Sequence, residues 1–70
     1  MRAKNSGIKD EDGKEIYEGD IIHEIHTDDN YNYDQKIVKY SDKEESFNIR
    51  TGHGIILRVV GNIYKNPELL

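Results

Sequence analysis

Cysteine is absent from this 70-residue chain, and proline occurs only once, at Pro67. Without cysteine the chain has neither disulfides nor thiolate metal ligands, a composition that fits a reducing compartment. No apolar run approaches the ~18 residues of a membrane-spanning helix, and no signal-peptide pattern precedes a cleavage site. We therefore expect a cytoplasmic protein that makes no contact with a membrane.

Leucine, alanine and methionine are scarce, with three, one and one residues against ten isoleucines and three valines. β-Branched side chains lose χ1 freedom in helices but pack well on a pleated surface, so the composition favours strands. Turn signals recur roughly every 8–12 residues, as in small all-β domains. We expect a flexible start at residues 1–6 and a single all-β domain at 7–70. Its form should be a small curled antiparallel sheet or an SH3-like barrel of four to six short strands.

Two glycine-containing turns are expected in the first third of the chain. Asp12-Gly13 stands between two short β-prone segments, residues 7–9 and 15–17. This pattern predicts a tight hairpin, because glycine adopts positive φ without strain. Gly19 predicts a second turn, and the Asp20 side chain is expected to accept hydrogen bonds from backbone amides there. We interpret Gly13, Gly19 and Asp20 as residues that preserve the fold.

The longer strands are expected where apolar residues alternate or cluster. In the first of them, successive side chains point to opposite faces, and we assign Ile21, His23 and Ile25 to the core face. Asn66-Pro67 has the pattern of a helix start, but the sequence after it allows only one turn. The predicted long strands lie near residues 20–27, 33–40, 46–50 and 54–60.

Two separated segments carry a family resemblance. Residues 7–22 read GIKDEDGKEIYEGDII, and residues 60–70 read VGNIYKNPELL. In both segments the chain resembles YopX-type proteins, which are small proteins of phages and prophages in Gram-positive bacteria. Members usually carry a further region before the first motif, so the resemblance is to their C-terminal domain. It implies a phage or prophage origin, a β-rich fold and the cytoplasm of a bacterial host, and it brings no catalytic residues.

Two patterns that could suggest a metal site do not have the required spacing. His23 and His26 are three residues apart on one expected strand, so they point to opposite faces and cannot share an ion without a bulge. Oxygen-bearing side chains alternate over residues 28–34 as in a calcium loop, but Tyr33 and Lys39 stand where such loops need Gly and Glu. With no cysteine to complete a tetrahedral site, we predict no metal.

Catalytic and cofactor patterns are also missing. The sequence has no Ser-His-Asp context, no glycine-rich phosphate loop and no cofactor fingerprint. Its paired carboxylates lie in expected turns, where raised pKa values are hard to sustain in water. We predict that the protein is not an enzyme and uses no cofactor.

Nucleic-acid binding is the alternative function. The first 35 residues have a net charge of -6 and the remainder +2, so an acidic first half argues against general polyanion binding. Small barrels nevertheless bind single strands by stacking bases on aromatic side chains beside a basic groove. The same residues can equally reflect the β-propensity of tyrosine and the protection of an edge strand by lysine. The candidates are Tyr31, Tyr33, Lys36, Lys39, Tyr40 and Arg50.

Protein binding is the leading prediction. A chain this short buries only roughly 60% of the surface of its unfolded form, and it has no disulfide to compensate. Residues 55–60 are the most apolar segment and exceed what a small core readily covers. We therefore expect a homo-oligomer, with a host protein as the other candidate partner. The predicted interface residues are Ile55, Ile56, Leu57, Val59 and Val60.

Overall fold

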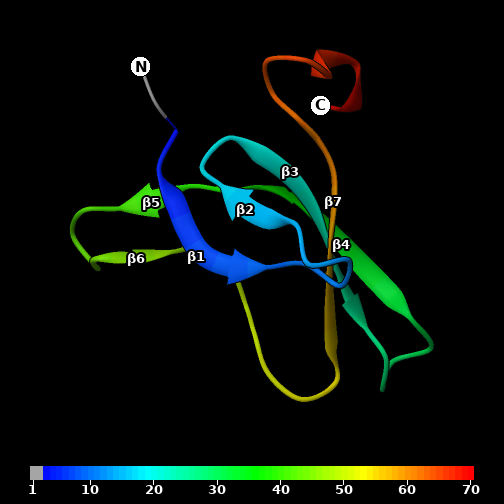
Figure 1. Ribbon diagram of the computed structural model, residues 1–70. Coiled ribbons are helices and arrows are strands. Elements are labelled where there is room, and N and C mark those ends of the chain that lie inside the picture. Colours follow the sequence, from blue (N-terminus) through cyan, green and yellow to red (C-terminus); the bar gives the residue numbers. More distant parts are fainter. Residues whose placement is uncertain (1–2) are drawn as a thin grey trace.

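The central element is a three-stranded antiparallel sheet in which β3 (Asp20–His26) lies between β4 (Asn32–Ile37) and β7 (Ile55–Asn62). The computed structural model describes residues 3–70 (Figure 1). β3 and β7 are rich in isoleucine and valine, which pack well on a pleated surface. The pairing of β3 with β7 shifts register between Ile21 and Ile22, so β7 has one extra residue there.

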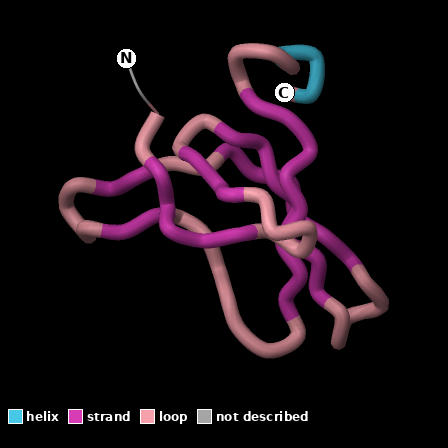
Figure 2. The backbone as a smooth tube through the Cα atoms, viewed as in Figure 1, coloured by secondary structure: helices cyan, strands magenta, loops and turns pink. Residues whose placement is uncertain are grey.

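Two hairpins and one short helix complete the described chain. β1 (Asn5–Lys9) pairs with β2 (Glu15–Tyr17), and β5 (Tyr40–Ser41) pairs with β6 (Ser46–Phe47). A single 3₁₀ turn, η1 (Pro67–Leu69), lies near the C-terminus (Figure 2). Residues 3–70 thus contain seven strands in three antiparallel sheets. The predicted all-β antiparallel fold is confirmed. Of the two expected forms the described residues have the open sheets and not the closed barrel.

The core lies between the β1–β2 hairpin and one face of the central sheet. Ile16 of β2, Ile22 of β3, Leu57 of β7 and Val38, just after β4, form its buried centre. Ile21 and Ile25 are buried as predicted, but this core centre lies on the opposite face of β3, with Ile22. Partly buried apolar side chains surround this centre: Ile8, Phe47, Ile49, Ile55 and Val59.

β3 is covered on both faces, so buried isoleucines occur on each of them. Ile21 is fully buried although it points away from the core centre. It pairs with Gly61, whose missing Cβ would lie 3.0 Å from the Leu69 side chain. The C-terminal turn therefore covers the second face, a packing that the alternation of residues in β3 does not indicate.

Several strand boundaries differ from the sequence prediction. The expected strand at 46–50 ends at Phe47, because the side-chain amide of Asn48 bonds the backbone of Ile37 and Lys39 in place of a strand. β1 begins at Asn5, so the last two residues of the expected flexible start belong to a strand. Residues 1 and 2 of that start lie outside the described residues.

Candidate functional site

Asp10 anchors the β1–β2 turn to β7. Its side chain is buried, and it accepts backbone N–H groups from Asp12 and Lys14, both at 2.9 Å, and from Val59 at 3.1 Å. Burial alone would raise the pKa of this carboxyl group, but these three hydrogen bonds and the charge of Lys14 outweigh it and lower the pKa. Asp10 is therefore a charged structural residue that the sequence analysis did not single out.

The two turn glycines have the expected positive φ, 80° at Gly13 and 92° at Gly19. The Gly19 N–H donates to the Val38 carbonyl at 2.9 Å, and the Gly19 carbonyl accepts the Ile63 N–H at 3.0 Å. The Asp20 carboxylate accepts the Tyr17 N–H at 2.8 Å, as its position in the turn suggested. The turn at Gly19 is thus joined by backbone hydrogen bonds to Val38 and to Ile63, which are distant in the sequence.

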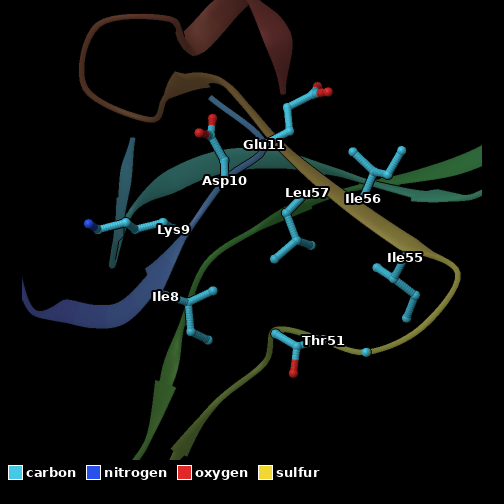
Figure 3. Close-up of a pocket in the computed structure, with 9 residues that line it drawn as sticks. Ile8, Lys9, Asp10, Glu11, Thr51, Ile55, Ile56 and Leu57 are labelled. Atoms are coloured by element: carbon cyan, nitrogen blue, oxygen red, sulfur yellow. The ribbon is translucent and has the colours of Figure 1, made fainter. Parts of the chain in front are cut away.

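A groove of about 300 Å³ lies between the end of β1, the turn that follows it and the start of β7; we call it the β1–β7 groove (Figure 3). Its acidic side chains are already engaged, because Asp10 holds three amides and Glu11 pairs with Arg58. The groove therefore offers a ligand mainly apolar contact. Its lining residues are Ile8, Lys9, Asp10, Glu11, Thr51, Gly52, Ile55, Ile56 and Leu57.

The outer edge of β7 is partly capped beside this groove. The Leu57 carbonyl accepts the Glu11 N–H at 2.9 Å, and the Val59 N–H donates to Asp10. In an antiparallel strand the N–H and C=O of one residue point to the same side. The Leu57 N–H therefore also faces outward, and so does the carbonyl of Ile55, whose N–H donates to Gly52 at 3.3 Å.

The five predicted interface residues occupy different environments. Ile55, Ile56 and Leu57 line the groove, although Leu57 is also a buried core residue. Val59 packs against the core, and Val60 lies at a separate depression beyond the groove. Residues 55–60 are thus more buried within the domain than their apolar composition suggested.

The nucleic-acid candidates do not form one surface. On β4, Tyr33 pairs with Ile25 and Lys36 pairs with Ile22, so the two side chains point to opposite faces. Tyr40 packs edge-on against Phe47 in the β5–β6 hairpin. The remaining candidates lie elsewhere: Tyr31 in the turn before β4, Lys39 between β4 and β5, and Arg50 in the loop before β7.

Glu24 is a buried acid that the sequence analysis placed outside the core. Only 1% of its surface is exposed, and its two carboxylate oxygens contact the Lys36 ammonium at 3.1 Å and the Arg50 N–H at 2.8 Å. The pair and the hydrogen bond hold the loop after β6 against the central sheet. An acid within an isoleucine-rich strand was the only sequence signal for this role.

The two histidines of β3 point to opposite faces, as expected. His23 stacks on Tyr33, with ring centroids 4.3 Å apart, and bonds Gln35 at 2.9 Å. On the other face the His26 Nε2 lies 3.3 Å from a carboxylate oxygen of Asp34. The imidazoles of His23 and His26 therefore cannot bind the same metal ion.

Comparison with known proteins identifies one family. A family model described as YopX protein matches residues 3–70. Searches of curated proteins and of solved structures find no match. Within the described residues, no helix is long and apolar enough to cross a membrane.

Proposed function

The chain belongs to the YopX family, and from this membership and the β1–β7 groove we propose that it is a phage or prophage accessory protein that binds protein. The bound protein is a second copy of the chain or a protein of the bacterial host. We also propose that the chain acts by binding and not by catalysis.

The observation that supports this proposal is the pairing of an apolar groove with an outward backbone edge. The Ile8 and Ile55 side chains are only partly buried there, so burial of their remaining apolar surface would favour association. The outward Leu57 N–H and Ile55 carbonyl are placed to pair with an extended segment. A partner strand would thus add backbone hydrogen bonds beside one inserted apolar side chain.

The same geometry argues against a small-molecule reaction. The groove volume, about 300 Å³, lies at the low end for ligand pockets, and the groove is open to solvent. The carboxylates of Asp10 and Glu11 are held by partners within the chain, so they are poorly placed to move protons.

Ile56→Glu tests this function, because Ile56 lines the groove without belonging to the core cluster. Val60→Glu is the matched control, since it places the same charge on the same strand outside the groove. Light scattering at high micromolar concentration should show an oligomer for the wild type and for Val60→Glu, and a monomer for Ile56→Glu.

If the wild type is monomeric, the host-protein form of the proposal is tested with the same three proteins as bait in a bacterial lysate. A protein retained in stoichiometric amount by the wild type and Val60→Glu, but lost with Ile56→Glu, supports the proposal. A monomeric wild type that retains no such protein overturns it.

A further inference from the structure

β4 forms an open edge of the central sheet. Its only neighbour within residues 3–70 is β3. Val38, directly after β4, donates its N–H to Asp20 and accepts the Gly19 N–H, so its backbone faces β3. Backbone groups of successive residues point to opposite sides of a strand. The N–H and C=O groups that point away from β3 are therefore those of Tyr33, Gln35 and Ile37.

This edge is less protected than the outer edge of β7. β4 contains no proline and pairs with β3 without a bulge, so it lacks two features that commonly block an edge strand. Among its outward backbone groups in the described chain, only the Ile37 carbonyl is bonded, to the Asn48 side-chain amide at 2.9 Å. A row of unpaired N–H and C=O groups is a template for another strand, and here Asn48 ends it at Ile37.

The side chains of β4 are complementary to those of a second, antiparallel β4. When a two-fold axis passes through Gln35, Asp34 of each copy lies opposite Lys36 of the other. On the other face of the sheet, Tyr33 of each copy lies opposite Ile37. Cross-strand pairs of opposite charge and of aromatic with β-branched side chains are both favourable.

Charge disfavours the two neighbouring registers. An axis through Asp34 places this residue opposite its own copy, and an axis through Lys36 does the same for the lysine. Like charges directly opposite each other are destabilising. The Asp34 side chain is 72% exposed, so it is accessible to another copy. The Lys36 ammonium contacts Glu24 and the Asn48 carbonyl, which leaves it a third N–H.

We propose that two copies of the chain associate through β4, antiparallel and centred on Gln35, so that their central sheets join edge to edge. The two Gln35 residues exchange backbone hydrogen bonds, and each Ile37 N–H donates to the Tyr33 carbonyl of the other copy. Only residues 33–37 of each copy take part, against roughly 20–30 residues a side in a stable interface, so the association is transient. It is separate from the β1–β7 groove, which lies beside β7 at the other edge of the sheet.

Single cysteines test this pairing, because the chain has none of its own. Residues directly opposite each other in such a ladder have Cα atoms about 5.5 Å apart, within reach of a disulfide. In a glutathione redox buffer, Gln35→Cys should form a disulfide-linked dimer at least about fivefold faster than Asp34→Cys, whose cysteines are displaced along the strand. Asp42→Cys lies exposed in the β5–β6 turn and measures random collisions.

The role of charge is tested in the Gln35→Cys background. Asp34→Lys places lysines opposite each other and should slow cross-linking at least about threefold. Asp42→Lys is the matched control, since it makes the same change of charge at an exposed position outside β4, and it should leave the rate within about twofold. Ile56→Glu should also leave the rate within about twofold, so a failure of the groove and a failure of this interface are distinguishable.

Circular dichroism establishes that each variant is folded before cross-linking. Equal rates for Gln35→Cys and Asp42→Cys overturn the proposal. Faster cross-linking by Asp34→Cys than by Gln35→Cys overturns the register, and equal effects of Asp34→Lys and Asp42→Lys overturn the role of charge.

Discussion

The carboxylate of Asp10 accepts the backbone N–H of Val59, 49 residues further along the chain, at 3.1 Å. This contact joins the turn of the N-terminal hairpin to the edge of β7, and Asp10 also lines the β1–β7 groove. Asp10 belongs to the first family motif, residues 7–22. Part of this motif therefore has a structural role, because it holds the N-terminal hairpin against β7.

Asp10→Ala should destabilise the domain, because three backbone amides, two of them within the turn, lose their acceptor. We expect a loss of about 1–3 kcal/mol in the free energy of unfolding, measured by urea denaturation. Asp12→Ala is the control in the same turn, since the Asp12 side chain is exposed. Equal effects of the two substitutions would contradict this role for Asp10.

Stability should depend on pH through Asp10. Folding lowers the pKa of its carboxyl group below the ordinary value of 3.8, so the folded state favours the charged form. The stabilisation is present above the unfolded pKa and is lost as the pH falls through the folded pKa. Thermal melts should show a decline in Tm below about pH 4 that is smaller in Asp10→Asn than in the wild type. An identical decline in both proteins would assign the acid sensitivity to other carboxylates.

Gly19→Ala should be more destabilising than Gly13→Ala. Both residues have positive φ, where a Cβ costs about 1–2 kcal/mol. At Gly19 the added Cβ would also lie 3.1 Å from the Tyr64 ring, whereas at Gly13 no atom lies within 4 Å. Melting temperatures of the two variants check this order, and equal losses would show that the Tyr64 contact has no effect.

Lys36→Met should destabilise the protein, because it leaves the buried Glu24 carboxylate without its cationic partner. We expect about 1–3 kcal/mol from chemical denaturation. Lys39→Met removes the same charge from an exposed position and should change stability by less than about 0.5 kcal/mol. Similar effects of the two substitutions would mean that the ion pair does not stabilise the fold.

Single-stranded DNA should bind weakly or not at all, because the tyrosine and lysine of β4 point to opposite faces. Fluorescence anisotropy with mixed-sequence DNA and RNA at low salt checks this expectation. Affinity that falls steeply with salt and drops by about 1–3 kcal/mol on Tyr33→Ala would favour the nucleic-acid alternative.

Local signals in the sequence were sufficient for the strands and the first hairpin. Asp12-Gly13 predicted the β1–β2 turn because its chemistry is contained in adjacent residues. The face of β3 could not be predicted, since Ile21 and Ile22 are both apolar and tertiary packing covers both. The strand expected at 46–50 is shorter than predicted, because the Asn48 side chain replaces strand pairing after Phe47.

The candidate groove was predicted only on its β7 side. Ile55, Ile56 and Leu57 were identified from their apolar clustering, but the opposite wall comes from Ile8 and the residues that follow it. Their position depends on the Asp10 contact with Val59, which no local pattern contains.

The position of β7 in the chain has a consequence for biosynthesis. β7 pairs with β3, and its Leu57 completes the core centre, yet it follows every other strand of the described chain. Until the ribosome has released residues 55–62, β3 lacks its second neighbour and Ile22 has no Leu57 to pack against. The nascent chain would therefore expose apolar surface until β7 emerges, because the central sheet requires pairing of segments that are distant in the sequence.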